Sequence, residues 1–366
     1  MGSKPVGISA SRGAAILDLS EYSTQFEVWQ RICEERRPGF NSDRGYVMPP
    51  DPDNAAIRWG SAFEDAVTEL AQARMGGCRI EDREVFWSVN GFGDEPWFQR
   101  QTGEHLPNYI TCHIDGRYSD SSEDFPAGTL HEGKTTGLFN YHDNWGEPGT
   151  DRIPQIYQVQ VQHQMLCTGA AQAIVSVLVF PRRPEEWEAE GIDVSEHDEE
   201  HPHWSIWKGL RSDFKPEHVA DCISWARTLA EMGLFHQYSV KASHTLQRKL
   251  VDAYCDFWHT YILTEKEPVL ATYEDVRRAF PNPVGTVVSD EQTEGWTREY
   301  SMIGEEISKT GRLGKRREEL RVLILKSMRA ADSTMDDESR EKTVLRDGKG
   351  GKLAQWDGTT FRGGKG

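Results

Sequence analysis

The sequence of 366 residues lacks the long apolar segments of a membrane protein. No apolar run approaches the roughly 20 residues that a membrane-spanning helix needs. The first fifteen residues, MGSKPVGISASRGAA, also lack the apolar core of a secretory signal peptide. They differ from the myristoylation pattern, which has Ser or Thr at its sixth position. We therefore expect a cytoplasmic protein with no membrane partner.

Closely spaced cysteines are absent as well. The six cysteines are never closer than 33 residues, which excludes a CxxC metal pair and argues against a disulfide framework. We expect buried thiols that pack as small apolar side chains. Three histidines, His113, His131 and His163, lie beside acidic or glutamine-rich segments, but their spacing fits no zinc site. We interpret them as structural.

An overall positive charge is also missing, since the formal net charge is −17. Such a balance argues superficially against nucleic-acid binding. Lysine and arginine nevertheless outnumber aspartate and glutamate from Ser301 onwards. A metal site requires carboxylates, and a DNA groove requires positive potential only locally, so the net charge does not exclude a DNA enzyme. With 10 % aromatic and 28 % charged residues, the composition is that of an ordinary globular chain of one large or two smaller domains.

The first half of the chain has the hydrophobic periodicity of alternating helices and strands. After a Ser-rich start, residues 9–35 favour helix. The pattern then predicts, in order, a helix, three strands, a second helix and an apolar strand, over residues 55–76, 79–89, 109–118, 129–136, 153–169 and 171–181. This order indicates an α/β fold with a mixed β-sheet flanked by helices.

The second half is mainly helical in pattern, most clearly over residues 244–263 and 314–331, with a hairpin expected over residues 343–361. We therefore predict an α/β core at residues 1–181 and a mainly helical C-terminal extension with a terminal hairpin at residues 182–366. The basic segment GRLGKRREELR in that extension fits either a contact with a phosphate backbone or one solvated helix face.

Two adjoining strand-like segments carry charged residues. Asp115 is set among apolar residues in HIDGRY, and Glu132 and Lys134 stand in TLHEGKTT. Because side chains alternate faces along a strand, Glu132 and Lys134 share one face. An unpaired charge is expensive in a half-buried sheet. If the segment of Asp115 pairs beside the second segment, all three charged ends can converge at one edge of the sheet.

Two nearby carboxylates repel each other unless a proton or a cation lies between them. Mg²⁺ suits such a pair, because it tolerates one or two carboxylates together with waters and phosphate oxygens. The main-chain carbonyl of Gly133 could be a third ligand, since a glycine lets another group approach the backbone closely. The lysine could steady a nucleophile or the charge on phosphorus. Alone, the pattern is weak, because an acid and a lysine two residues apart are common on exposed strands.

Three further segments accompany this pattern. Trp59, Gly60 and Glu64 lie in IRWGSAFEDAVTELA, the segment IYQVQVQHQMLCTG has the spacing Tyr-x-x-Gln-x-Gln, and GISASRGAAIL is rich in small residues. In type and order, over roughly residues 4–181, all five segments resemble the phage lambda-exonuclease or YqaJ-type viral recombinase family of the PD-(D/E)xK nuclease superfamily. One departure is Ile114, where the family usually has a proline before the aspartate. That proline supplies no ligand.

The resemblance implies a role for each matching residue. Asp115 and Glu132 would ligate Mg²⁺, or Mn²⁺ as a substitute, with help from the carbonyl of Gly133. Glu64 would complete this site or bridge to a second metal position. Lys134 would be the catalytic lysine.

Single residues of the glutamine segment and of the N-terminal segment would contact the substrate. Gln160 would position the attacking water or the phosphate, and Tyr157, on the same helical face, is a candidate DNA contact. Lys4 and Ser11 match the positions that hold the 5′ phosphate of a DNA end. Trp145 lies in a predicted loop after the second charged segment and is our candidate for stacking on DNA. The other tryptophans are interpreted as core residues.

The resemblance further implies a PD-(D/E)xK core with Mg²⁺-dependent DNA exonuclease activity. It implies 5′→3′ digestion of linear double-stranded DNA, which leaves 3′ single-stranded tails for recombination by strand annealing. It also implies a homo-oligomeric ring, often a trimer, and a single-strand annealing protein as partner. A phage-encoded protein of this kind would act in the cytoplasm of a bacterial host.

Other functions fit parts of the sequence. A RecB-like nuclease with an iron–sulfur cluster needs clustered cysteines near its C-terminus, whereas the last cysteine here is the isolated Cys255. A restriction-type or repair endonuclease of the same superfamily is an alternative. A catalytically silent DNA-binding or assembly protein is another, although Asp115, Glu132 and Lys134 are all present.

Overall fold

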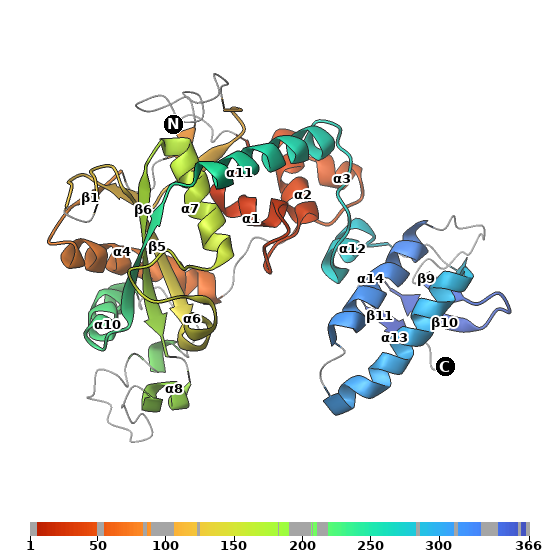
Figure 1. Ribbon diagram of the computed structural model, residues 1–366. Helices are drawn as coiled ribbons and strands as arrows, with labels where there is room; N and C mark the ends of the chain where they lie inside the picture. The colour runs from red at the N-terminus through yellow and green to blue at the C-terminus, as the bar shows by residue number, and fades with distance from the viewer. Residues whose placement is uncertain are drawn as a thin grey trace. The chain divides into compact units, whose positions relative to one another are not determined.

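The chain divides into two compact units, whose elements are labelled in Figure 1. Unit 1 comprises Met1–Leu19 and Pro50–Asp256, and unit 2 comprises Ser20–Pro49 and Phe257–Gly366. The computed structural model describes residues 6–49, 55–82, 86–88, 106–122, 125–181, 183–189, 206, 208–210, 219–282, 286–310, 314–330, 343–357 and 360–363. Within those ranges, no helix has the length and apolar character needed to cross a membrane.

Unit 1 contains a mixed sheet and the helices around it. Its helical elements are η1 (Ala10–Arg12), α1 (Gly13–Ile16), α4 (Ala55–Arg74), α6 (Leu138–Asn144), α7 (Gln155–Thr168), α8 (Pro184–Ala189), α10 (Val219–Glu231) and α11 (His244–Phe257), the last ending at the unit boundary. Its strands are β1 (Ile80–Glu81), β2 (Phe86–Ser88), β3 (Thr111–His113), β4 (Gly116–Tyr118), β5 (Leu130–Gly137), β6 (Gln172–Phe180) and β7 (Phe235–Lys241).

The main sheet of unit 1 has the strand order β1-β4-β5-β6-β7 among the described residues. Strands β5 and β6 are parallel, and the other neighbours are antiparallel. A parallel pair needs a long crossover connection, which α6 and α7 provide here. Every residue of β6 is buried, as expected for a strand covered on both faces. The predicted mixed sheet flanked by helices is confirmed.

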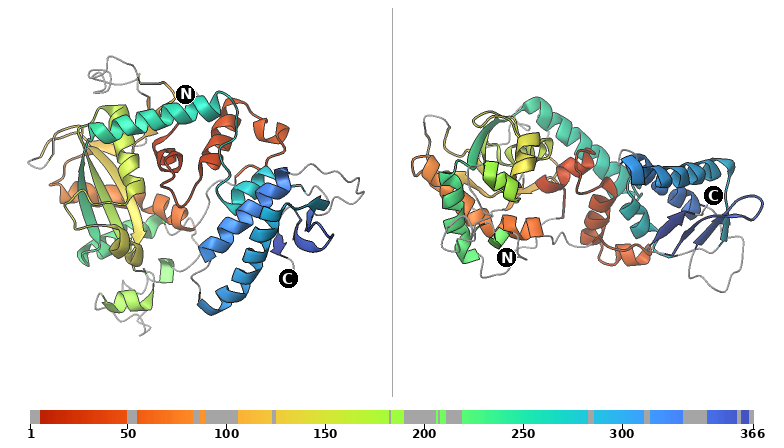
Figure 2. Two further views of the ribbon diagram at one scale, coloured as in Figure 1. Left: turned by 45° about the vertical axis from the view of Figure 1, so that its right-hand side comes forward. Right: turned by 90° about the horizontal axis from the view of Figure 1, so that it is seen from below.

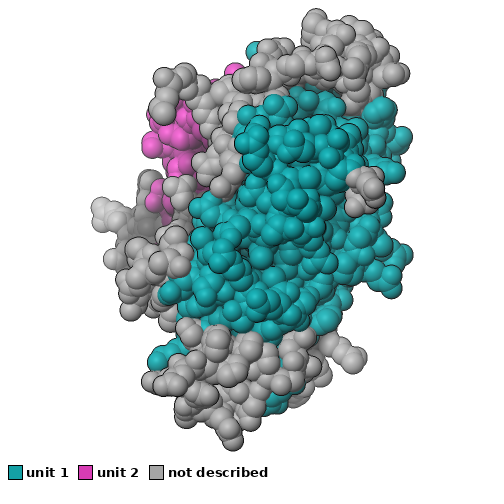
Figure 3. All heavy atoms as spheres, turned by 90° about the vertical axis from the view of Figure 1, so that its left-hand side faces the viewer, with its two compact units in different colours: residues 1–19, 50–256 teal, residues 20–49, 257–366 magenta. Residues whose placement is uncertain are grey.

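Helices cover both faces of this sheet (Figures 1 and 2). On one face, α4 packs on β5 and β6 and against α10, with the rings of Phe63 and Phe180 4.8 Å apart and those of Trp59 and Trp225 5.9 Å apart. On the other face lies α7, which begins after Pro154 and ends at Gly169 as its sequence predicts. Figure 3 shows unit 1 in teal over one face of the molecule.

Small residues let the N-terminal segment lie close to α7. Ile8 pairs with Ile110 beside β3. A Cβ added to Gly13 would lie 2.1 Å from the hydroxyl of Tyr254, so this position accepts only glycine without rearrangement. That hydroxyl lies 3.1 Å from Nδ1 of His163, whose Nε2 lies 2.9 Å from the Thr111 carbonyl. His163 is therefore a buried structural histidine, as the sequence analysis expects.

Three strand predictions differ from the structure. The run at residues 79–89 contains β1, which pairs with β4, and β2, which pairs with β3. The run at residues 109–118 is divided at Ile114 and Asp115 into β3, which pairs with β2, and β4, which pairs with β5. In the part expected to be mainly helical, β7 joins the main sheet as the antiparallel neighbour of β6. The compact units therefore do not divide at residue 181, because β7, α10 and most of α11 belong to unit 1.

Unit 2 combines a helical segment from near the N-terminus with the C-terminal part of the chain. Its helical elements are α2 (Gln25–Arg36), α3 (Phe40–Asp43), the π-helical turn η3 (Trp258–Ile262), α12 (Tyr273–Ala279), α13 (Glu291–Thr310) and α14 (Gly314–Ala330). Its strands are β8 (Thr286–Val288), β9 (Thr343–Arg346), β10 (Lys352–Trp356) and β11 (Phe361–Gly363), in the sheet order β11-β10-β9-β8. The predicted terminal hairpin is present as the antiparallel pair β9 and β10.

The arginines of the basic segment in α14 contact neighbours within unit 2. Arg316 donates to Glu299 through Nε at 2.8 Å and Nη2 at 3.0 Å. The guanidinium of Arg321 lies 4.6 Å from the ring centroid of Tyr273, and that of Arg317 lies 4.6 Å from the ring of another tyrosine. These contacts favour a structural helix face over a phosphate-binding surface.

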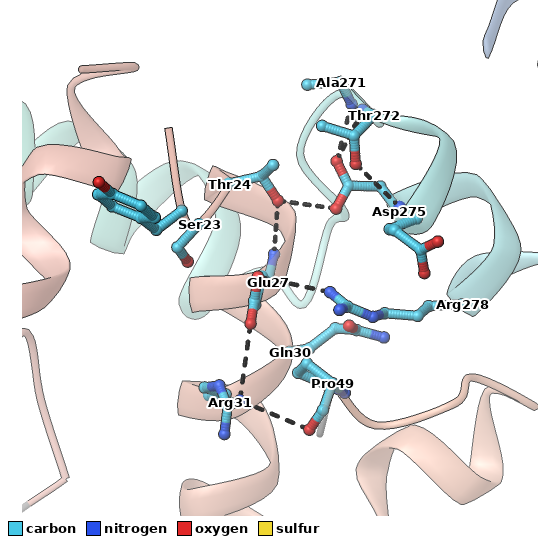
Figure 4. Close-up of polar contacts among 12 residues, drawn as sticks. Ser23, Thr24, Glu27, Gln30, Arg31, Pro49, Ala271, Thr272, Asp275 and Arg278 are labelled. Carbon is cyan, nitrogen blue, oxygen red and sulfur yellow. Dashed lines mark hydrogen bonds and ion pairs between the residues drawn. The ribbon is translucent and has the colours of Figure 1, made fainter. Parts of the chain in front are cut away.

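A buried carboxylate ties the two parts of unit 2 together (Figure 4). Asp275 is fully buried, and its Oδ1 accepts a hydrogen bond of 2.7 Å from the hydroxyl of Thr24. Its Oδ2 accepts from the backbone N–H groups of Ala271 and Thr272, each at 3.0 Å. One side chain thus caps α12 and holds the start of α2 against it.

We predict that Asp275→Ala lowers the free energy of unfolding of unit 2 by about 3 kcal/mol, because it leaves buried donors without an acceptor. The matched control Glu274→Ala removes an exposed ion pair with Arg277 and should cost less than about 1 kcal/mol. Urea unfolding followed by tryptophan fluorescence measures both. Equal midpoints for the two variants would contradict this assignment.

Candidate active site

Strand β5 presents an acid and a lysine toward α7. Glu132 and Lys134 are two residues apart and share the face of β5 opposite to the one that packs on α4. The side chain of Glu132 is 1 % exposed and that of Lys134 is 17 % exposed. The Nζ of Lys134 donates to Oε1 of Glu132. The shared face predicted from the alternation of the strand is confirmed.

Two glutamines of α7 also bind the carboxylate of Glu132. The Nε2 of Gln160 donates to Oε1, and the Nε2 of Gln164 donates to Oε2 at 2.7 Å. These residues are one helical turn apart and therefore face the same strand. With Lys134, three donors surround the buried carboxylate.

Asp115 lies at the open edge of β5, where β4 has not yet begun. Gly116, the first residue of β4, pairs with His131, so the next positions along β5 have no partner in β4. There Oδ2 of Asp115 accepts a hydrogen bond of 2.9 Å from the N–H of Gly133. In a strand, the N–H and C=O of one residue point to the same side, so the carbonyl of Gly133 faces this edge too.

The absence of a side chain at Gly133 lets α4 approach the same edge. A Cβ at this position would lie 3.3 Å from Cγ1 of Val67 and 3.7 Å from Oδ2 of Asp115. A larger residue would press on the helix beside the Asp115 carboxylate. The glycine between the acid and the lysine therefore serves close packing.

Two carboxyl groups and one ammonium group lie near one another at this edge of β5. Burial, together with the negative charge of Asp115, raises the pKa of Glu132 to about 7, against the lowering effect of Lys134. Burial alone would lower the pKa of Lys134, but the charges of Glu132 and Asp115 hold it above its ordinary value. Lys134 is therefore a persistent ammonium group between two acids.

The oxygen donors at this edge fit a hard divalent cation. Asp115 and Glu132 offer carboxylates, and Gly133 offers a carbonyl, which are the ligands that Mg²⁺ and Mn²⁺ prefer. The raised pKa of Glu132 supports this fit, because a second cation would relieve the repulsion from Asp115. Within the described ranges, no group of three or more His, Cys, Asp or Glu side chains is arranged to hold a metal ion.

Glu64 comes from the other side of β5. Gly60, one turn before it on α4, and Val67, one turn after it, both face β5. Glu64 is therefore on the half-buried side of α4 that packs on the strand, whereas Glu132 points to the opposite face. A metal role for Glu64 stays a prediction.

A row of aromatic side chains in contact with one another begins beside the lysine. The Nζ of Lys134 lies 5.1 Å from the ring centroid of Tyr157. The ring of Trp145 lies 5.6 Å from that of Tyr157 and 5.0 Å from that of Tyr238. Trp145 is only 7 % exposed, which leaves little surface for a stacked base. In the structure Trp145 packs against two tyrosines, and its contact with DNA stays a prediction.

Of the two N-terminal candidates, Ser11 is the one that lies within the described residues. Ser11 is exposed on η1, which packs against α7 and β3, and its hydroxyl lies 3.1 Å from that of Ser9. Lys4 lies outside the described residues. A phosphate-binding role for both residues stays a prediction.

Gln164 belongs to this site although its position in the sequence did not predict a role there. The four glutamines at alternating positions of α7 suggest mainly a polar helix face. Instead, Gln160 and Gln164 both bind Glu132, whereas Gln162 is bound to the turn between β7 and α11. The i, i+4 spacing was the available indication, because it places two amides on one face.

The chain is similar to one protein family and to several solved structures. Residues 2–171 match the family described as the YqaJ-like viral recombinase domain. An alkaline exonuclease from Laribacter hongkongensis, solved in complex with dAMP, is 12 % identical with a TM-score of 0.38, over 70 % of this chain and 89 % of that chain. A phage-related exonuclease from Haemophilus somnus 129PT is 12 % identical with a TM-score of 0.36, over 72 % of this chain and 98 % of that chain. No curated protein matches the chain.

We predict that Mg²⁺ binding releases a proton below about pH 7. The carboxyl of Glu132, with its pKa raised to about 7, must lose its proton before it can ligate a cation. Affinity should therefore rise by up to about tenfold per pH unit below this pKa and level off above it. Calorimetry in two buffers of different ionisation enthalpy measures the released proton.

Glu69→Gln is the matched control, because Glu69 is an exposed acid of α4 that pairs with Arg227. This variant should release protons as the unchanged protein does. Metal binding without proton release at pH 6 would contradict the prediction.

Proposed function

We propose, from the match of residues 2–171 to the YqaJ-like viral recombinase domain, that this chain is a divalent-metal-dependent deoxyribonuclease. The reaction would be hydrolysis of a phosphodiester bond by in-line attack of water, leaving a 5′ phosphate. The observation that carries the proposal is the arrangement at β5, where Lys134 contacts Glu132 while Asp115 binds the neighbouring peptide N–H of Gly133.

Asp115, Glu132 and the carbonyl of Gly133 would hold Mg²⁺ or Mn²⁺. When bound, the cation would polarise the scissile phosphate and favour ionisation of the attacking water. The ammonium of Lys134 would stabilise the negative charge that develops on the phosphate oxygens. Because its pKa is raised, Lys134 keeps its proton near neutral pH and is suited to this electrostatic role rather than to that of a base.

Gln160 and Tyr157 of α7 would complete the active site beside Lys134. Gln160 donates to the same oxygen of Glu132 as Lys134 does, so its amide lies near the ammonium group of the lysine. Its role would be to orient water or phosphate. Tyr157 lies beside the Nζ of Lys134 and would support the lysine or contact DNA. Lys4 and Ser11 would bind the 5′ phosphate of the DNA end.

We propose that the enzyme is an exonuclease that digests linear duplex DNA in the 5′→3′ direction and supplies 3′ tails to a single-strand annealing protein. A homo-oligomeric ring and a bacterial cytoplasmic location would accompany this activity. The support for these finer points is the resemblance of residues 4–181 to the lambda-type family. A restriction-type endonuclease and a catalytically silent DNA-binding protein are the alternatives to be tested.

We expect Lys134→Ala to lower the rate of duplex digestion by about 10² to 10³-fold at saturating Mg²⁺, because it removes charge stabilisation in the transition state. Lys249→Ala, which changes an exposed lysine of α11, should leave the rate unchanged. The assay uses linear duplex labelled at the 5′ end, with and without Mg²⁺. Equal digestion by wild type and Lys134→Ala would overturn the proposed mechanism.

The topology of the substrate separates an exonuclease from an endonuclease. An end-dependent enzyme should leave covalently closed circular duplex intact while it digests the same DNA after linearisation. Early release of the 5′ label as mononucleotide indicates 5′→3′ polarity. Cleavage of the closed circle would favour the endonuclease alternative, and no cleavage of either form with Mg²⁺ or Mn²⁺ would favour the silent one.

A further inference from the structure

The glutamine at the C-terminal end of α7 makes two contacts through one nitrogen. The Nε2 of Gln164 donates to Oε2 of Glu132 at 2.7 Å and to the main-chain carbonyl of His113 at 3.1 Å. An amide nitrogen has two protons, so both are used. Glu132 stands on β5, and His113 is the last residue of β3, two residues before Asp115. One side chain therefore joins the strand of one acid to the strand that leads to the other.

The orientation of this amide is fixed by its partners. Both acceptors are oxygens, so a flipped amide would place its own oxygen against the carboxylate of Glu132. In the observed orientation, Oε1 of Gln164 is buried and has no hydrogen-bond partner among the described residues. A buried carbonyl oxygen without a partner destabilises the fold. We interpret this loss of stability as the consequence of a functional requirement for the two hydrogen bonds that Nε2 donates.

We propose that Gln164 is a positioning residue of the metal site, which keeps Glu132 and the backbone before Asp115 in the relation that a shared cation needs. Gln164 does not itself contact the cation or the reacting atoms. It acts by aligning one oxygen of Glu132 and by anchoring the end of β3. This inference rests on the proposed function, since it assumes that Asp115 and Glu132 bind a divalent metal.

Another buried glutamine of α7 provides a matched control. Gln162 is 2 % exposed, like the 1 % exposed Gln164, and lies half a turn away on α7. Its Nε2 donates to the carbonyl of Lys241 at 2.8 Å, and its Oε1 accepts from the N–H of Ser243 at 2.8 Å. Gln162 therefore holds the turn between β7 and α11 and does not contact either acid of the candidate site.

The test compares Gln164→Met with Gln162→Met, since methionine keeps the length of the side chain and removes both hydrogen bonds. Binding of Mn²⁺ is measured by calorimetry at one pH, together with the unfolding midpoint. We expect Gln164→Met to weaken Mn²⁺ binding by about 10- to 100-fold, the usual effect of losing a group that orients a metal ligand. Gln162→Met should change Mn²⁺ affinity less than about twofold, within the normal scatter for a remote substitution.

Gln164→Asn is a second variant in case the methionine variant does not fold. It keeps the amide but is too short to reach Glu132, and the same loss of affinity is expected. Unchanged Mn²⁺ affinity in a folded Gln164 variant, or an equal loss in Gln162→Met, would overturn the inference. If the unchanged protein itself binds no Mn²⁺, the proposed function fails instead, so the two failures are distinct.

Discussion

The site depends on a charged carboxylate that is buried under a helix. Glu132 is 1 % exposed, and burial by itself disfavours its ionised form. Lys134, Gln160 and Gln164 reduce this cost by donating to its two oxygens. Since two of these donors belong to α7, the helix must keep a fixed register against β5. The contacts between α7 and β5 therefore both pack the helix on the sheet and stabilise the carboxylate of Glu132.

The topology of the sheet explains why the acids meet where they do. Strand β6 is the fully buried neighbour of β5, so one edge of β5 is occupied throughout its length. On the other edge, β4 begins only at Gly116, which leaves the peptide of Gly133 open to the Asp115 carboxylate. Because the antiparallel strand β4 begins only at Gly116, the residues of β5 after His131 have no strand partner on this edge in the part of the chain that the structure describes. A cation at this edge would face both carboxylates without entering the core.

Much of this arrangement was predictable from periodicity. Alternation along the strand placed Glu132 and Lys134 on one face, and the apolar run of β6 identified a strand in the interior of the sheet. The division between β3 and β4 was not predictable, because the sequence around Asp115 is strand-like throughout and only pairing with two different partners separates the strands. β7 was missed because its burial alternates over few residues, such as Tyr238 and Val240. The role of Gln164 depends on which side of α7 meets the sheet, which tertiary packing decides.

The central claim is that Asp115 and Glu132 share one divalent cation at the open edge of β5. Anomalous diffraction from crystals soaked in Mn²⁺ tests this claim most directly, because it locates the ion without reference to activity. The account predicts an anomalous peak between the two carboxylates and beside the carbonyl of Gly133. Manganese bound elsewhere in the crystal, with no peak at this edge, would contradict it.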